Sequence, residues 1–258
     1  MTTTKSVAIV TGASQGIGRA TAVRLARDFS VIVLVARDED ELAKTAAEVK
    51  SAGADAMVFA LDLRQPGSAM TIVEGTLEPF GRIDALLNIA GAVPQLDLFQ
   101  MTDEQWDDAM ALKFHGARRL TMRAWDALKA SNGSVVLMSG NAAFAPKTGS
   151  AAVATINAAI NALAKAFAEQ GVKDGVQVNS VSPGAVMTGR RRAFFESWAP
   201  LHTVTVEEAI KRFPEQVGSI RLGTPGEIAD LISYLVSPAA KWMTGASIRM
   251  DGGEIKSI

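Results

Sequence analysis

The sequence predicts a single α/β domain, residues 1–258, built on a doubly wound, mostly parallel sheet. Short and almost continuously apolar segments recur at regular intervals, and longer segments with helical spacing lie between them. No repeat, low-complexity segment or linker interrupts this alternation. With 48% apolar residues and 22 glycines in 258 residues, the chain suits one such domain with a well-buried core.

Seven segments rich in β-branched residues or leucine have the length and composition of strands that helices cover on both faces. These predicted strands are Ser6–Thr11, Val31–Ala36, Ala56–Leu61, Ile83–Asn88, Ser134–Ser139, Val176–Val181 and Ser247–Met250.

The predicted helices fill the intervals between these strands. Thr102 and Gln105 have the spacing of a capping box, and Pro225 stands where proline favours a helix start. The predicted helices are Ile17–Asp28, Glu39–Ala52, Ser68–Phe80, one beginning at Thr102, Ala151–Gln170 and one introduced by Pro225.

One interval, at about residues 185–222, lacks a clear helical pattern. It contains the basic run Arg190–Arg192 together with Phe194, Phe195 and Trp198. Long insertions in compact domains are usually functional lids or disordered segments, and this one follows the carboxyl end of a strand, where α/β sheets bind ligands. We therefore expect a substrate lid. Its basic run has two interpretations, a preference for an anionic substrate or an ordinary solvated face.

The composition excludes several classes of protein. The chain has no cysteine, two histidines far apart (His115 and His202) and one tyrosine, Tyr234. Disulfides, thiol nucleophiles and Cys-ligated zinc or iron–sulfur clusters are therefore excluded, and no metal centre is expected. The formal net charge of −1 argues against nucleic acid as the main partner. Neither a membrane span nor a signal peptide is found, so we expect a cytoplasmic protein that acts on small molecules.

A glycine-rich turn, Thr11–Gly18, joins the first predicted strand to the first predicted helix. Such a turn can be merely structural, but its place between strand and helix favours dinucleotide binding. Gly12 permits the tight turn, Gly16 lets a pyrophosphate approach the backbone, and Gly18 lets helix and strand pack closely. The phosphates then meet free N–H groups at the start of the helix.

Arg37 follows the end of the second predicted strand, where a carboxylate would accept the ribose 2′-hydroxyl of NAD. A guanidinium at this position can pair with the 2′-phosphate of NADP, so NADP(H) is favoured over NAD(H). Two alternatives stay open: Arg37 is an ordinary solvated arginine, or the neighbouring Asp38 contacts a ribose.

Almost the whole chain resembles the short-chain dehydrogenases/reductases, which have a Rossmann fold. The resemblance rests on five ordered motifs. They are the loop Thr11–Gly18, the pair Asp62-Leu63, the segment Asn88–Gly91, the segment Val178–Gly184 with Thr188, and Met243–Gly245 with Asp251–Gly253.

The resemblance implies a nicotinamide dinucleotide site and a homodimer or homotetramer. The implied cofactor-binding residues are Gly12, Ser14, Gln15, Gly16, Ile17, Gly18, Arg37, Asp62, Leu63, Asn88, Ala90, Gly91, Pro183, Gly184, Val186 and Thr188.

The family's catalytic residues are not found at their positions. In the family the fifth strand ends in a serine, and a tyrosine and then a lysine follow one turn apart on the next helix. Here the serine position falls on Gly140, beside Ser139, the tyrosine position on Val153 and the lysine position on Asn157. The single tyrosine, Tyr234, lies in the last predicted helix, away from the expected site.

Lys113 stands where the family has an asparagine that anchors a water for proton relay, so asparagine and lysine have exchanged positions. The exchange favours an active-site role for Lys113 as proton donor, with Ser139 and Asn157 as hydrogen-bond donors. The alternative is a helix-surface lysine like Lys129. His115 and His202 are weaker candidates.

Two hypotheses follow. The first is an NADP(H)-dependent oxidoreductase that interconverts a small-molecule ketone and a secondary alcohol with a non-standard proton donor. The second is a non-catalytic or strongly impaired NADP(H)-binding protein, a sensor or partner subunit on the same fold. A different reaction in the same pocket, such as dehydration or epimerisation, is a further possibility.

Overall fold

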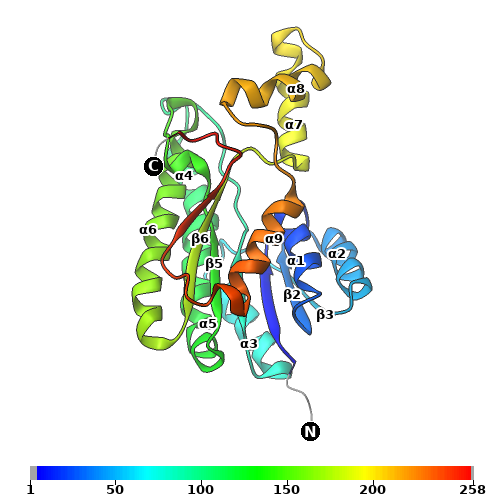
Figure 1. Ribbon diagram of the computed structural model, residues 1–258, viewed down its shortest axis with the longest axis vertical. Coiled ribbons are helices and arrows are strands. Elements are labelled where there is room, and N and C mark those ends of the chain that lie inside the picture. Colours follow the sequence, from blue (N-terminus) through cyan, green and yellow to red (C-terminus); the bar gives the residue numbers. More distant parts are fainter. Residues whose placement is uncertain (1–4, 257–258) are drawn as a thin grey trace.

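The computed structural model describes residues 5–256 as one seven-stranded parallel sheet with helices on both faces (Figure 1). The strand order is β3-β2-β1-β4-β5-β6-β7, which confirms the predicted doubly wound α/β architecture. The strands are β1 (Val7–Thr11), β2 (Val31–Ala36), β3 (Asp55–Ala60), β4 (Ala85–Asn88), β5 (Ser134–Met138), β6 (Gln177–Pro183) and β7 (Ser247–Met250).

The helices follow the order that the sequence predicts, with two more in the interval 185–222. The α-helices are α1 (Gly16–Leu25), α2 (Glu39–Ser51), α3 (Ser68–Phe80), α4 (Asp103–Ala109), α5 (Ala117–Ser131), α6 (Ala151–Asp174), α7 (Gly189–Trp198), α8 (Val206–Val217) and α9 (Pro225–Val236). A π-helix, η1 (Met110–Gly116), joins α4 to α5, and short 3₁₀ turns are η2 (Asn141–Ala143), η3 (Thr148–Ser150), η4 (Pro200–His202) and η5 (Pro238–Ala240).

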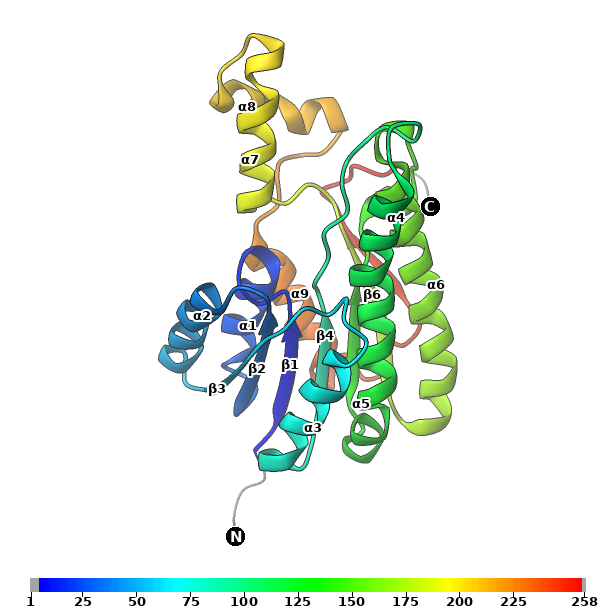
Figure 2. The same ribbon diagram turned by 180° about the vertical axis from the view of Figure 1, so that it is seen from behind.

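The sheet separates two hydrophobic clusters, because alternate residues along a strand face opposite sides. On β1, Val7 and Ile9 join the cluster that packs under α3, α5 and α6. Ala8 and Val10 join the cluster that packs under α1, α2 and α9. Figures 1 and 2 show these two helical layers from opposite sides.

The two edge strands are less covered than predicted. Every residue of β1, β4, β5 and β6 is buried, whereas β3 and β7 keep exposed or half-buried residues, and Val58 of β3 is 37% exposed. The expectation that all seven strands are covered on both faces is therefore wrong for β3 and β7. At the edges of a sheet the flanking helices cover only the inner side of the last strand.

Some helix boundaries also differ from the prediction. Helix α6 continues to Asp174, where Gly175 with φ = +75° ends it. The helix predicted from Thr102 begins with the expected capping box, in which the Thr102 and Gln105 side chains bond to each other's backbone N–H. It then runs through α4, η1 and α5 to Ser131.

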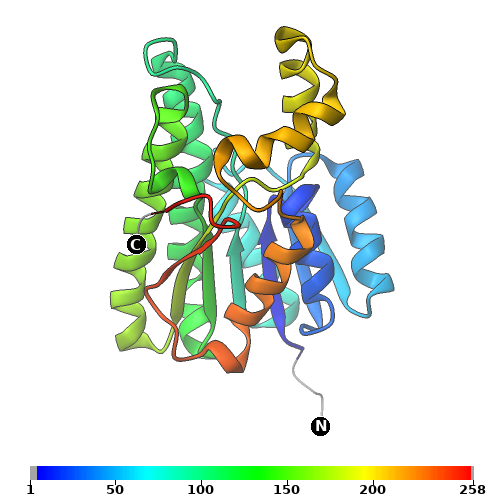
Figure 3. The ribbon, with the colours of Figure 1, turned by 45° about the horizontal axis from the view of Figure 1, so that its top comes forward.

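Residues 185–222, named the arm from here on, rise above the carboxyl ends of the strands (Figure 3). Its two ends are tied together, because the N–H of Met187 donates to the carbonyl of Gly223 at 2.8 Å and the N–H of Gly223 donates to the carbonyl of Ala185 at 2.9 Å. The arm has a small core of its own around Phe195, Ala199 and Ala209.

The expectation that this interval lacks clear helices is wrong, because it contains α7 and α8. The three consecutive arginines at the start of α7 interrupt its apolar periodicity, so the sequence pattern does not indicate a helix. The aromatic residues of α7 pack within the arm and not on the sheet. Helix α8 has a signal that the prediction did not use, the capping box formed by Thr205 and Glu208.

By length and composition alone, residues 148–174 could span a membrane. In the structure, however, α6 lies along β5 and β6 and buries Ile156, Ile160 and Ala164. This packing is that of a helix that covers one face of an α/β sheet, with 39% of the apolar window buried.

Replacing Gly18 by alanine tests the packing of α1 on β1. The added Cβ would lie 2.0 Å from the carbonyl oxygen of Gly12, a backbone atom that cannot swing away. Overpacking of this kind costs about 1–3 kcal/mol, so we expect the free energy of unfolding in urea to fall by about 2 kcal/mol. The control is Gly149→Ala, where an added Cβ has no heavy atom within 4 Å. Equal unfolding midpoints for the two variants would contradict this account.

Candidate active site

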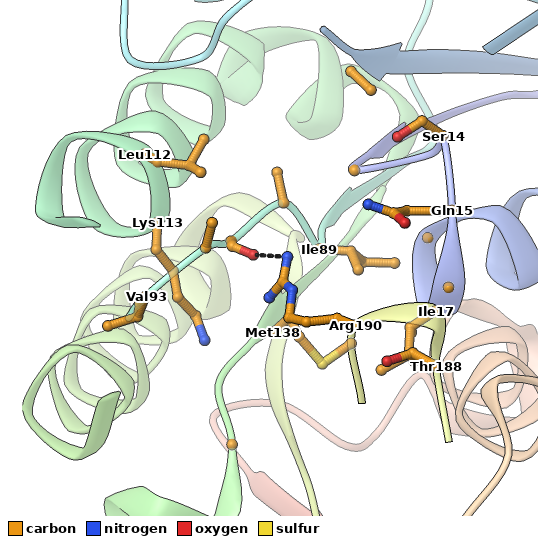
Figure 4. Close-up of a pocket in the computed structure, with 18 of the residues that line it drawn as sticks. Ser14, Gln15, Ile17, Ile89, Val93, Leu112, Lys113, Met138, Thr188 and Arg190 are labelled. Carbon is orange, nitrogen blue, oxygen red and sulfur yellow. Dashed lines mark hydrogen bonds between the residues drawn. The ribbon is translucent and has the colours of Figure 1, made fainter. Parts of the chain in front are cut away.

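A cavity of about 920 Å³ lies at the carboxyl ends of the central strands, beneath the arm (Figure 4). This is where ligands bind in open α/β sheets. The structure brings all of the predicted site residues except Asn88 to its wall. Those that line it are Gly12, Ser14, Gln15, Gly16, Ile17, Gly18, Arg37, Asp62, Leu63, Ala90, Gly91, Lys113, Ser139, Asn157, Pro183, Gly184, Val186 and Thr188.

The glycine-rich turn has the shape that the sequence predicts. Gly12 and Gly16 have φ values of +68° and +56°, which other residues rarely adopt. At Gly18 there is no room for a side chain, because a Cβ would lie 2.0 Å from the carbonyl oxygen of Gly12. At Gly16 a Cβ would lie 3.4 Å from Cγ2 of Thr188. Helix α1 begins at Gly16, so its first N–H groups lie at this turn. The turn is therefore a cradle for an anionic group such as a pyrophosphate.

Thr11 joins the ends of β1 and β4 beneath the cavity. Its Oγ1 donates to the carbonyl of Leu87 at 3.2 Å and accepts the N–H groups of Ile89 and Ala90 at 2.9 and 3.0 Å. Thr11 is not among the predicted cofactor-binding residues, although a polar residue at the end of an apolar strand is a signal of this role.

Asn88 does not line the cavity. It is 5% exposed, and its Nδ2 donates to Thr121 Oγ1 of α5 at 3.0 Å. The prediction that Asn88 contacts a cofactor is therefore corrected: as the last residue of β4, its side chain points into the layer between β4 and α5 and holds the two together.

Arg37 lies at one end of the cavity, just after β2. It is exposed and forms no ion pair with any residue in the range 5–256. The neighbouring Asp38 caps α2, since its Oδ1 accepts the N–H of Glu41 at 3.0 Å. The capping bond involves only Oδ1 of Asp38, and both Arg37 and Asp38 line the cavity at this end.

Lys113, Ser139 and Asn157 meet at the other end of the cavity. Lys113 lies in the π-helix η1, and its Nζ donates to Asn157 Oδ1 at 2.5 Å and to the carbonyl oxygen of Ser139 at 3.2 Å. The hydroxyl of Ser139 donates to the backbone carbonyl of Asn157 at 2.9 Å. Single π-helical turns inside α-helices are frequent at functional sites. The alternative that Lys113 is a helix-surface lysine is excluded by these contacts.

Burial and, to a smaller extent, the positive charge of Arg190 together lower the pKa of Lys113 to about 8. No carboxylate among residues 5–256 pairs with its ammonium group. The amine of Lys113 therefore exchanges protons near neutral pH, as a general acid or base requires.

Glycines make room for this cluster. A Cβ at Gly140 would lie 2.6 Å from Asn157 Nδ2, and a Cβ at Gly91 would lie 3.1 Å from Cδ of Lys113. Sequence analysis assigned Gly140 only as the residue at the serine position. Val153, one helical turn before Asn157, also lines the cavity and presents no polar group there.

The other candidates lie elsewhere. Tyr234 is 46% exposed and borders a separate surface hollow with Ile248 and Met250. His115 is outside the cavity lining, and His202 stacks on Trp198 in the arm with ring centroids 3.7 Å apart. In the described part of the chain, no group of three or more histidine, aspartate or glutamate side chains could hold a metal ion.

The sequence and the fold match known reductases along almost the whole chain. A family model described as enoyl-(acyl carrier protein) reductase matches residues 12–254. The short-chain reductase protein NovJ of Streptomyces niveus is 31% identical over 249 residues, which cover 96% of this chain and 94% of NovJ. The chain belongs to the short-chain dehydrogenase/reductase family.

Solved structures of short-chain reductases superimpose closely on this chain. L-Sorbose reductase from Gluconobacter frateurii, complexed with NADPH and L-sorbose, has a TM-score of 0.93 at 26% identity, with 98% of this chain and 97% of that chain covered. A variant of actinorhodin polyketide ketoreductase with NADPH has a TM-score of 0.92 at 28% identity, with 98% and 99% covered.

The titration of Lys113 is directly measurable. Acetic anhydride modifies only neutral amines, so the rate of acetylation at Lys113, followed by mass spectrometry against pH, should reach half its maximum at about pH 8. Lys129 is the internal control, because its hydrogen bond to Asp174 raises the pKa of Lys129. A Lys113 profile that coincides with that of Lys129 would show that burial does not depress its pKa.

Proposed function

We propose that this member of the short-chain dehydrogenase/reductase family is an NADP(H)-dependent oxidoreductase that interconverts a ketone and a secondary alcohol, with Lys113 as proton donor. The observation that carries the proposal is the cluster of Lys113, Asn157 and Ser139 at the end of the cavity opposite Arg37. A cofactor-binding cavity with a titratable amine at one end is the arrangement that carbonyl reduction requires.

The cavity suits NADP(H). The glycine cradle accepts a pyrophosphate, and Arg37 is available to a 2′-phosphate at the end of β2. L-Sorbose reductase and actinorhodin ketoreductase, whose folds this chain shares, were solved with NADPH. When bound, the nicotinamide supplies the hydride. Ser14, Gln15, Thr188 and the other lining residues listed above would hold the cofactor in place.

Lys113 can supply the proton. A protonated amine has three N–H donors, and two of those of Lys113 are taken by Asn157 Oδ1 and the carbonyl of Ser139. The third is available to a substrate oxygen in the cavity. The Asn157 amide oxygen and the Ser139 backbone carbonyl accept from Nζ and hold it in place, in contrast to the expected role of both residues as hydrogen-bond donors. Val153, at the position of the family's tyrosine, has no proton to give.

Residues 185–222 are proposed as the lid over this site, because the arm stands above the cavity and its α7 contributes Arg190, Arg191 and Phe194 to the lining. A homodimer or homotetramer remains a prediction from the resemblance to the family, and a cytoplasmic location remains a prediction from the sequence.

Substitution of Arg37 tests the choice of cofactor. A charge-assisted hydrogen bond contributes about 1.5–3 kcal/mol, so Arg37→Ala should raise the Kd for NADPH by about tenfold or more and leave the Kd for NADH within about twofold. Quenching of protein fluorescence measures both constants. Arg27→Ala, at an exposed position outside the cavity, is the control. An equal loss of affinity for both dinucleotides would refute the proposed pairing with the 2′-phosphate.

Substitution of Lys113 tests the proton donor. Because only the charged amine can donate, kcat/KM for ketone reduction by the unmodified protein should be level below pH 7 and fall as pH rises through about 8. Alcohol oxidation needs the neutral amine, so its rate should rise through the same pH range. Lys113→Met should lower kcat by about 10²–10⁴-fold and abolish the pH dependence of both reactions near pH 8.

Two outcomes would contradict this proposal. A Lys113→Met variant with an unchanged rate and pH profile would show that the proton comes from elsewhere. Saturable NADPH binding without turnover on a broad panel of ketones would favour the non-catalytic dinucleotide-binding protein instead.

A further inference from the structure

The charged side chains that line the cavity divide unevenly between its two ends. Among the described residues, its carboxylates are Asp38, Glu41 and Asp62, and its cations are Arg37, Lys113, Arg190 and Arg191. The three carboxylates lie in the part of the wall formed by α2 and the segment after β3, close to Arg37. The end that holds Lys113 has cations alone.

Each carboxylate already has its own partner. Asp38 caps α2, Glu41 pairs with Lys44 and with Arg19, and Asp62 pairs with Arg64 at 3.3 Å. None of the three therefore compensates the charges of Lys113 or Arg190.

The basic run of the arm is divided by the structure into three different environments. Arg192 points outward and pairs with Glu196 at 3.2 Å. The guanidinium of Arg191 lies over the rings of Phe194 and Phe213 at 5.4 and 5.3 Å. Arg190 extends into the cavity, where its Nη2 donates to the carbonyl oxygen of Gly91 at 2.9 Å (Figure 4).

Arg190 and Lys113 approach the same glycine from two sides. The methylene groups of Lys113 pack against Gly91, and Arg190 bonds to its carbonyl. Their positive charges are close enough for Arg190 to lower the pKa of Lys113. Neither has a carboxylate partner within residues 5–256. Two neighbouring cations without a counter-charge repel each other, and an anion that binds between them relieves this repulsion.

We propose that the carbonyl substrate is a short oxo acid, whose carboxylate binds Arg190 while Lys113 faces its carbonyl oxygen. This inference rests on the proposed function and adds its substrate class. A guanidinium has five N–H donors in a planar fork, so the contact with Gly91 leaves donors for a bidentate carboxylate. The Arg190 guanidinium and the methylene groups of Lys113 both lie at Gly91, so a substrate whose carboxylate and carbonyl are only a few bonds apart can meet both side chains.

The alternative source of an oxyanion is the pyrophosphate of the cofactor, which offers the same chemistry to Arg190. The two sources differ in what the loss of Arg190 would weaken. If the anion belongs to the substrate, loss of Arg190 lowers the affinity for an oxo acid and leaves the affinity for the dinucleotide unchanged. If the anion belongs to the cofactor, loss of Arg190 lowers the affinity for the dinucleotide and leaves the affinity for the oxo acid unchanged.

Equilibrium binding separates these cases without turnover, since NADP⁺ cannot reduce a ketone. Calorimetry on the protein–NADP⁺ complex would compare 2-oxopentanoate and 3-oxopentanoate with their methyl esters, which keep the carbonyl and lack the charge. We expect at least one acid to bind about tenfold or more tightly than its ester, as a charged hydrogen bond requires.

Arg190→Met should remove this difference and leave the Kd for NADP⁺ within about twofold, whereas Arg190→Lys should retain part of it. Arg192→Met is the matched control, because its side chain belongs to the same run but points away from the cavity. It should bind acid and ester as the unmodified protein does.

The proposal is overturned if the unmodified protein binds acids and esters equally, or if Arg190→Met preserves the preference for the acid. A tenfold weaker NADP⁺ affinity in Arg190→Met, with the acid preference intact, assigns Arg190 to the cofactor instead. Turnover with NADPH is measured separately, so an oxo acid that binds but is not reduced would count against the proposed function and not against this specificity.

Discussion

The hydrogen bonds of Lys113 hold together the end of the cavity where chemistry is proposed. Its Nζ bridges the carbonyl after β5 to the amide oxygen of Asn157 on α6, while its own backbone lies in the π-helix between α4 and α5. Three elements distant in sequence are thus joined by one ammonium group. Gly140 and Gly91 pack closely against the side chains of Asn157 and Lys113, and neither position has room for a Cβ.

This bridge also explains why an amine of depressed pKa is stable where it lies. A buried lysine without a carboxylate is destabilising in its charged form, and two oxygen acceptors reduce that penalty without removing the charge. The pKa of Lys113 falls to about 8, because burial and the positive charge of Arg190 both disfavour the charged amine. An amine held in this balance can give up or take a proton at physiological pH, which a fully paired surface lysine such as Lys129 cannot do.

The glycine cradle and the end of the cavity around Lys113 differ in how far the sequence predicts them. At the glycine-rich turn, Gly12, Gly16 and Gly18 have the backbone geometry that the motif predicts. A tight strand–turn–helix connection needs residues without a Cβ at particular positions, and the spacing of the glycines in the sequence shows these positions. At the reacting end the sequence predicted that Lys113 and Asn157 lie close together, and the structure confirms this contact. Asn88 was placed in the cavity by its motif alone, and its side chain lies instead between β4 and α5. The roles of Arg190, Arg191 and Arg192 were unreadable, because three identical side chains in one helical turn point in different directions.

The sequence by itself determined the doubly wound sheet, the glycine cradle, Arg37 at the end of β2 and the presence of a single tyrosine. All of these follow from local spacing, hydrophobic periodicity and composition, which need no knowledge of distant contacts. Only the tertiary structure decided which cations meet without a counter-charge, how the arm folds into α7 and α8, and which strands lie at the edges. Those features depend on burial and on contacts between segments far apart in the chain, and the energy of a charge is set by the groups around it in space.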